Sequence, residues 1–163
     1  MWMNGIRTRA SSGGNEELVF SPVAAVVVIR DSKQLLLYRK PGSDVWELPG
    51  GAARRGETLE QTARRELAAQ TGFHAGELEV WKVLCTPELP APEGEGEQVQ
   101  EVVGVFYTET SSGTQCESKV QSRQIEWREM HDLPSLHPTT SLIIRQWMTR
   151  TDEEKEAAAR KSG

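Results

Sequence analysis

The segment from Gly51 to Phe73 constrains the fold more than any other part of this 163-residue chain. It follows the sequence WELPG at 46–50 and reads as a loop, then a helix, then a second loop. The paired glycines at its start allow a tight turn and a close approach of the backbone to a ligand. Good helix formers then run from Glu57, which we expect in the first helical turn, to Gln70, and Gly72 is expected to cap the C-terminus.

The expected helix has two distinct faces. At about 100° per residue, one side collects Leu59, Thr62, Ala63, Glu66, Ala69 and Gln70. Glu57 and Arg64 share another side with Arg65 nearby, which favours an acid–base pair there. Taken alone, charges at helical spacing indicate only an ordinary amphipathic helix with a solvated side.

The spacings within this segment resemble the Nudix box. The box pattern is Gly, five residues, Glu, seven residues, Arg-Glu, an apolar residue, any residue, Glu-Glu, any residue, Gly and an apolar residue, and this chain follows it from Gly51 through Arg65-Glu66 to Gly72-Phe73. The preceding Leu-Pro-Gly is also typical of the family. The resemblance covers residues 46–73 and implies a mainly structural role for four of them, which are Gly51, Glu57, Arg65 and Gly72.

The chain departs from the box at two carboxylates. Ala69 and Gln70 stand where the family has its Glu-Glu pair, so Glu66 alone remains of the three family carboxylates that bind metal. The resemblance implies Mg²⁺ or Mn²⁺ held by Glu66 and by the carbonyl of Gly50, with Glu66 as metal ligand or catalytic base. Hard cations prefer charged oxygen ligands, so we expect this metal site to be weakened.

A substitute carboxylate is expected after the box, because family members often recruit one from a loop there. This chain is acidic from Glu93 to Glu97 and again at Glu101. We select Glu101 as the metal ligand and catalytic residue, since a strand start controls the aim of a side chain better than a loop does. Glu47 and Glu60 are weaker candidates, and a solvated acidic loop without a role is the alternative.

Candidate substrate-binding residues lie before the box. Arg39 and Lys40 stand at the end of an expected strand, where they either meet the phosphates of a ligand or are simply solvated. Trp46 is either a core aromatic or a platform on which a base stacks. We select Arg39 and Trp46 as the substrate-binding pair.

Apolar patterning predicts strands on both sides of the central helix. The strands are expected at 18–30, 35–39, 46–48, 78–85, 99–108 and 124–128, and a second helix at 140–149. The first two strands form a hairpin, and the whole indicates an α+β or α/β layered domain. The resemblance implies the Nudix fold, an α/β/α sandwich with a mixed β-sheet between helices. A flexible arm at 1–16 and a charged tail at 151–163 flank the domain at 17–150.

Composition limits the partners and the compartment. A net charge of −5 gives no general attraction to nucleic acid polymers or anionic membranes, and no apolar run is long enough to span a membrane. Cys85 and Cys116 form no disulfide pattern and no signal-peptide core is visible, so we expect free thiols in the cytoplasm. Dimers are common among Nudix relatives, which makes a homodimer compatible with the resemblance.

The resemblance leaves two main functions open, and a purely structural or interaction domain is a third, weaker possibility that the sequence does not separate from the second. The first is a Nudix-type hydrolase with a nonstandard, weakened metal site, which cleaves a phosphoanhydride bond in a nucleoside diphosphate derivative. In such a reaction, metal ions offset the negative charge of the phosphate oxygens while water attacks phosphorus. The second is a catalytically inactive Nudix domain that binds a nucleotide or a protein partner as a regulatory module. Glu66 and Glu101 favour the first function, whereas Ala69 and Gln70 favour the second.

Overall fold

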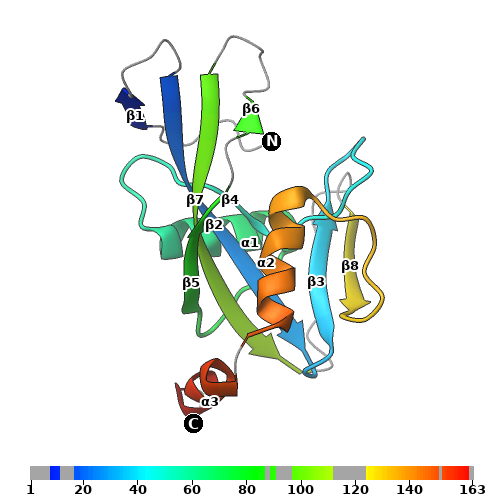
Figure 1. Cartoon of the computed structure of the whole chain (residues 1–163). Coiled ribbons are helices and arrows are strands. Elements are labelled where there is room, and N and C mark those ends of the chain that lie inside the picture. The colour runs from blue at the N-terminus through cyan, green and yellow to red at the C-terminus, as the bar shows by residue number, and fades with distance from the viewer. Residues whose placement is uncertain are drawn as a thin grey trace.

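One eight-stranded sheet organises the part of the chain that the computed structural model describes, which is residues 8–11, 17–86, 89–90, 97–111, 124–150 and 152–161. Its strands are β1 (Thr8–Ser11), β2 (Glu17–Arg30), β3 (Gln34–Arg39), β4 (Gly50–Ala52), β5 (Glu79–Cys85), β6 (Leu89–Pro90), β7 (Glu97–Thr110) and β8 (Gln124–Glu129). The helices are α1 (Leu59–Thr71), α2 (Pro138–Met148) and α3 (Asp152–Lys161). The main strand order is β5-β7-β2-β3-β8, with β1 and β4 paired to β2 and β6 to β7 (Figure 1).

Strand β2 is the centre of this sheet. It runs parallel to β7 along its whole length, from Glu17 opposite Glu97 to Arg30 opposite Thr110. It pairs antiparallel with β3 and β4. Its apolar run from Val23 to Ile29 is buried at every position, as expected for a strand covered on both faces. The predicted mixed sheet and the predicted hairpin of the first two long strands are therefore confirmed.

Helices cover the sheet on two sides, which confirms the predicted α/β/α sandwich (Figure 1). Alternate residues of β2 point to opposite faces. On one face a cluster of buried apolar side chains joins β2 to α1; it includes Ala24, Val26, Val28, Ala63 and Leu67. On the other face a second cluster joins β2 to α2 through Val23, Ala25, Val27, Ile143, Ile144 and Trp147. We call these the α1 side and the α2 side of the sheet.

Some element boundaries differ from the predictions. Residues 46–48 do not form a strand, because Trp46 and Glu47 make only isolated bridges, to Leu136 and Tyr38, and the strand that enters the box is β4. Strand β1 lies inside the expected N-terminal arm, and α3 makes most of the expected tail helical. Helix α2 begins at Pro138, earlier than expected, because His137 accepts a hydrogen bond as its N-cap.

Other predictions fall on residues that the structure does not describe. The acidic residues Glu93 and Glu95 are among them, and so is Cys116. Cys85 is described, and it is an exposed free thiol. Among the described helices, none combines the length and the apolar character needed to cross a bilayer.

Helix α1 is capped at both ends by its own sequence. Thr58 is the N-cap: its hydroxyl accepts the N–H of Gln61 at 3.1 Å, and the Gln61 side chain accepts the N–H of Thr58 at 2.9 Å. Gly72 is the C-cap in a left-handed conformation, with φ 71°, as predicted. Glu57 therefore precedes the helix, and its expected place in the first turn is wrong because Thr58 provides the cap.

Candidate functional site

The loop that enters the box lies against both the sheet and α1. Gly50 pairs with Ala25 of β2, and Gly51 pairs with Ala24. A Cβ atom on Gly50, whose φ is 157°, would lie 2.1 Å from the carbonyl oxygen of Ala24. A Cβ on Gly51 would lie 2.8 Å from Cδ of Glu66. Glycine is therefore required at Gly50 by the backbone of the sheet, whereas a larger residue at Gly51 would displace the Glu66 side chain.

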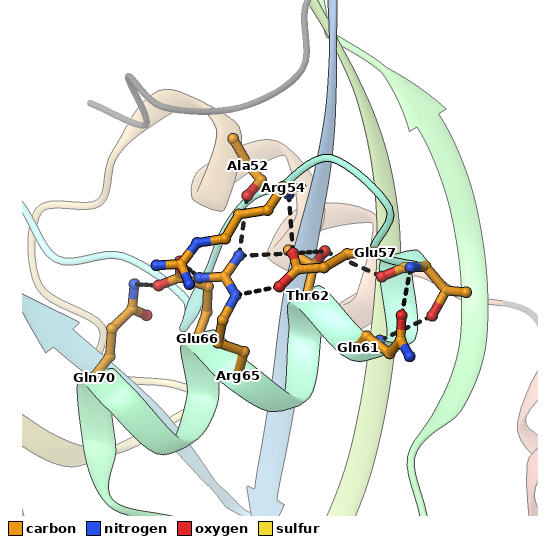
Figure 2. A network of polar contacts seen from close by, with 9 residues as sticks. Ala52, Arg54, Glu57, Gln61, Thr62, Arg65, Glu66 and Gln70 are labelled. Carbon is orange, nitrogen blue, oxygen red and sulfur yellow. Dashed lines mark hydrogen bonds and ion pairs between the residues drawn. The ribbon is translucent and has the colours of Figure 1, made fainter.

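Glu57 and Arg65 join the loop to the helix. Arg65 donates from Nε to Glu57 Oε1 at 2.6 Å and from Nη2 to Glu57 Oε2 at 2.9 Å, which is a bidentate pair (Figure 2). Glu57 Oε2 also accepts the N–H of Arg54 and the hydroxyl of Thr62, each at 2.9 Å. Arg65 Nη2 lies 3.3 Å from the carbonyl oxygen of Ala52, to which it donates. The geometry agrees with the bracing role that the resemblance implies.

The acid–base pair expected at Glu57 forms with Arg65 and not with Arg64, the residue on its predicted helical side. Arg64 instead donates to Glu60, one turn earlier, at 3.0 Å, and to the carbonyl oxygens of Ala75 and Gly76 at 2.8 and 3.2 Å. Glu57 lies before the helix, so the helical periodicity that placed it beside Arg64 does not apply to it.

The brace has a clear electrostatic signature. Hydrogen bonds from the Arg65 guanidinium are the largest cause that lowers the pKa of Glu57, from its usual 4.5 to about 2. The same contact raises the pKa of Arg65 above its ordinary value. Both groups remain charged over the physiological pH range, so the pair stays an ion pair and does not exchange protons with a substrate.

Glu66 is already paired at both of its carboxylate oxygens. Arg65 Nη1 donates to Oε1, and Gln70 Nε2 donates to Oε2 at 2.9 Å (Figure 2). The Gln70 amide also contacts the peptide groups of Gly50: Oε1 accepts the N–H at 2.9 Å, and Nε2 donates to the carbonyl oxygen at 2.8 Å. The structure thus brings together the predicted ligands Glu66 and Gly50, with Gln70 between them.

The residues at this position do not fit a divalent cation. Mg²⁺ and Mn²⁺ require several oxygen ligands with free lone pairs and negative charge. Here the Gly50 carbonyl and the Glu66 carboxylate both accept hydrogen bonds from nitrogen. Ala69 is exposed and carries no oxygen on its side chain. Across the described residues, no three side chains from His, Cys, Asp and Glu are gathered so that they could hold a metal ion.

Glu101 lies on the α2 side of the sheet, whereas Glu66 projects from α1. It alternates along β7 with Val103 and Val105, which both belong to the α2-side core. Its carboxylate accepts a hydrogen bond from Thr139 Oγ1, at the start of α2, at 3.5 Å. The predicted joint role of Glu101 and Glu66 in one metal site is therefore not supported by their positions.

Glu101 belongs to a cluster of charged and polar residues. We call it the α2-side cluster, and it consists of Lys40, Glu47, Glu101, His137 and Thr139. Glu47 is only 3% exposed, and Lys40 Nζ lies 3.4 Å from its Oε2. Burial is the largest cause that raises the pKa of Glu101, and burial likewise lowers the pKa of His137. The His137 ring accepts the N–H of Thr139 at 3.3 Å, which caps α2.

Of the two predicted substrate-binding residues, only Arg39 is accessible. Trp46 is 7% exposed and packs in the α2-side core, so its proposed role as a stacking platform for a base is corrected to a core role. The guanidinium of Arg39 lies 5.1 Å from the centroid of the Trp46 ring, and Arg39 donates to Gln124. Arg39 remains half-buried at the rim of the sheet.

A separate cavity of about 470 Å³ lies beyond the C-terminal end of α1. Its lining includes Phe73, Glu77, Glu79, Tyr107 and Glu109. Burial, followed by the hydrogen bond to Glu79, raises the pKa of Tyr107 to about 12. Three carboxylates repel an anionic diphosphate, so this cavity is not where we seek a nucleotide.

The sequence reasoning missed two features of the site. It treated Gln70 as a lost carboxylate, although its amide contacts both expected metal ligands. It also treated Lys40 as a strand-end charge and Glu47 as a weak metal candidate, although they form a largely buried ion pair. Lys40 and Glu47 are seven positions apart with Pro41 between them, a spacing that does not indicate an ion pair. Gln70 follows Glu66 by four positions, and this helical spacing could have indicated the contact between their side chains.

Comparison with known proteins identifies relatives for most of the chain. The model of the NUDIX domain family matches residues 20–151. An ADP-ribose pyrophosphatase of Methanocaldococcus jannaschii is 27% identical over 135 residues, which cover 80% of this chain and 76% of that protein. An RNA pyrophosphohydrolase of Legionella pneumophila is 33% identical over 55 residues, which cover 34% of this chain and only 31% of that relative's length. The NUDIX domain of NrtR from Shewanella oneidensis, solved in complex with ADP-ribose, has a TM-score of 0.61 at 22% identity and covers 78% of this chain and 86% of that one.

Proposed function

Since this chain belongs to the NUDIX domain family, we propose that it binds a nucleoside diphosphate derivative and that its metal-dependent hydrolysis of this ligand is strongly reduced. The scaffold of the box is intact, from Gly51 through the Glu57–Arg65 brace to the Gly72 cap. The carboxylates that this scaffold would present to a metal-bound diphosphate are incomplete, because Ala69 and Gln70 replace two of them. Binding with little turnover is the function that agrees with both observations.

The ligand class rests on the relatives. The M. jannaschii relative is named as an ADP-ribose pyrophosphatase, and the NrtR domain was solved with ADP-ribose. Both names describe a nucleoside diphosphate joined to a second group. ADP-ribose is therefore the first probe for this chain, and the half-buried Arg39 is the cation that we propose to meet its phosphates.

A single observation carries the proposed loss of turnover: the Glu66 carboxylate and the Gly50 carbonyl, the two expected metal ligands of the box, both accept hydrogen bonds from nitrogen. Hydrolysis of a phosphoanhydride requires charge on the phosphate oxygens to be offset while water attacks. With Ala69 and Gln70 in place of two carboxylates, we expect hydrolysis to be slower by a factor on the order of 10² or more than with a complete carboxylate set.

A second candidate function is a Nudix-type hydrolase whose nonstandard metal site is completed by the substrate. The retained Glu66, held beside the Gly50 carbonyl, favours it. In this proposal Glu66 is the catalytic residue, and Mg²⁺ or Mn²⁺ arrives with the phosphates, without Glu101, which lies on the α2 side. The second function requires the Gln70 amide to leave its present contacts.

The experiment compares binding and turnover in one protein. Calorimetric titration with ADP-ribose is performed with Mg²⁺ and with EDTA, and the same mixtures are analysed for released AMP by chromatography. We expect binding in both conditions and little AMP. Rapid release of AMP that Glu66→Gln abolishes would establish the hydrolase instead, and no binding in either condition would refute the ligand class.

Location and oligomeric state stay predictions. The cytoplasmic location rests on the free thiol at Cys85 and on composition. A homodimer is tested by sedimentation of the purified chain, and neither outcome changes the proposed site.

A further inference from the structure

Gln70 is a buried side chain whose polar atoms are fully used. It is 5% exposed, although it stands at a position where the Nudix box carries a carboxylate. Its amide makes three hydrogen bonds, to Gly50 N–H, to the Gly50 carbonyl and to Glu66 Oε2, with lengths of 2.9, 2.8 and 2.9 Å. A buried glutamine whose amide makes three hydrogen bonds stabilises the structure and is more than a neutral replacement for a lost carboxylate.

The orientation of the amide follows from chemistry. The N–H of Gly50 can only donate, so it must face the oxygen of the Gln70 amide and not its nitrogen. The NH₂ group then faces the Gly50 carbonyl and Glu66, and its two hydrogens serve the two acceptors. Flipping the amide would set its NH₂ group against the Gly50 N–H at one end and its oxygen against two acceptors at the other.

The two acceptors are the oxygens that the box would offer to a cation. The other carboxylate oxygen of Glu66, Oε1, accepts a hydrogen bond from the charged guanidinium of Arg65. Hydrogen-bond donors therefore perform the two tasks of a cation here: they hold Glu66 to the loop, and they offset its charge. A glutamate at position 70 would do neither, because it would place a second negative charge against Glu66 and a carbonyl.

We infer that the Gln70 amide substitutes for the divalent cation in this box, and that the loop at 50–57 is held in place without metal. Gln70 is a positioning residue: it fixes Glu66 and Gly50 by hydrogen bonds that a cation would have to displace. Displacement would leave a buried amide unpaired, which opposes metal binding. With the proposed function as premise, the affinity of the chain for an anionic ligand is then independent of Mg²⁺, because the loop is held in place without a cation.

The test measures thermal unfolding of the full chain in EDTA and in millimolar Mn²⁺. No nucleotide is present, so a result against this inference does not depend on whether the chain binds ADP-ribose. The variant is Gln70→Glu, and the matched control is Gln146→Glu on α2, where Lys82 is the neighbour. We expect the wild-type Tm to be the same in both buffers. Gln70→Glu should lose on the order of 5 °C in EDTA and regain most of it in Mn²⁺, because a carboxylate there needs the cation. The control should respond to neither buffer.

Two outcomes would overturn the inference: a wild-type Tm that rises in Mn²⁺, or a Gln70→Glu variant that is as stable as wild type in EDTA. If Gln70→Glu does not fold, the wild-type side-chain amide signals decide by NMR. The Gln70 NH₂ protons should exchange slowly and stay unshifted and unbroadened in Mn²⁺, whereas those of the exposed Gln61 should exchange rapidly. Equally rapid exchange of both, or broadening of the Gln70 signals by Mn²⁺, would refute the proposal.

Discussion

The box and the α2-side cluster both contain carboxylates, yet they treat them in opposite ways. In the box, Glu57 accepts four hydrogen bonds of 2.6–2.9 Å, and its pKa falls to about 2. In the α2-side cluster, the carboxylate of Glu101 accepts a bond of 3.5 Å from Thr139, and burial raises its pKa. Charge is stabilised where donors converge on the carboxylate and is disfavoured where burial comes with few donors.

The box is a structural region, whereas the α2-side cluster can change its protonation state. The charged side chains of the box pair with one another, so they hold the loop and leave no oxygen ready for a cation. The α2-side cluster holds charge at a cost, which makes it sensitive to protons and to bound ligands. The retained motif thus marks the more inert of the two regions.

The largest effect is expected from breaking the contact between the box loop and the sheet. Gly50→Ala should cost roughly 3 kcal/mol or more of unfolding free energy, because the new Cβ meets the Ala24 carbonyl oxygen at 2.1 Å. Gly42→Ala is the matched control, since Gly42 also has positive φ, 75°, but no atom within 4 Å of its Cβ position. The control should cost about 1 kcal/mol from backbone strain alone. Equal losses in urea denaturation would show that the loop can move away from β2.

A smaller effect is expected from removing the brace. Arg65→Met should cost about 2 kcal/mol, because Glu57 and Glu66 both lose a charged donor. Arg64→Met, at the adjacent position, should cost about 1 kcal/mol or less, since its ion pair with Glu60 is exposed. Chemical denaturation of both variants measures the difference. If Arg64→Met is the more damaging change, the brace has been assigned to the wrong residue.

The pH dependence of stability should differ in sign between the two regions. The lowered pKa of Glu57 contributes stability that is present above 4.5 and is lost as pH falls towards about 2. Replacing Glu57 with Gln should therefore destabilise the protein at neutral pH and flatten its acid unfolding curve. The raised pKa of Glu101 contributes stability that is present at acid pH and is lost as pH rises, so Glu101→Gln should stabilise the protein at neutral pH. Thermal unfolding from pH 3 to pH 8 tests both, and shifts of the same sign would contradict the comparison.

The smallest effect is expected at the rim of the α2 side. Arg39→Ala should weaken ADP-ribose binding by about tenfold or less, which is the contribution of one charged hydrogen bond, and should leave the Tm almost unchanged. Arg145→Ala is the matched control, because Arg145 is exposed in the last turn of α2. Calorimetry gives both affinities. An unchanged affinity in Arg39→Ala would remove Arg39 from the proposed ligand site.

The fold was predictable because its determinants are local. The apolar run of β2 and the spacings from Gly51 to Gly72 each specify an element without reference to distant residues. Glu101 illustrates the limit: alternation along β7 places it on the face of Val103, but the sequence does not say which helix covers that face. Gln70 illustrates another limit, because its bonds to Gly50 depend on the path of the loop, which no periodicity describes.

The most direct test of the central claim is a calorimetric titration of Mn²⁺ into the wild-type chain and into the Ala69→Glu/Gln70→Glu double variant. The account predicts no saturable binding to the wild type, because Gln70 and Arg65 occupy the oxygens of Gly50 and Glu66. It predicts saturable binding to the double variant, at least about tenfold tighter than any residual wild-type binding. Tight wild-type binding that is lost in Glu66→Gln would contradict the account and return the box to the metal-dependent hydrolases.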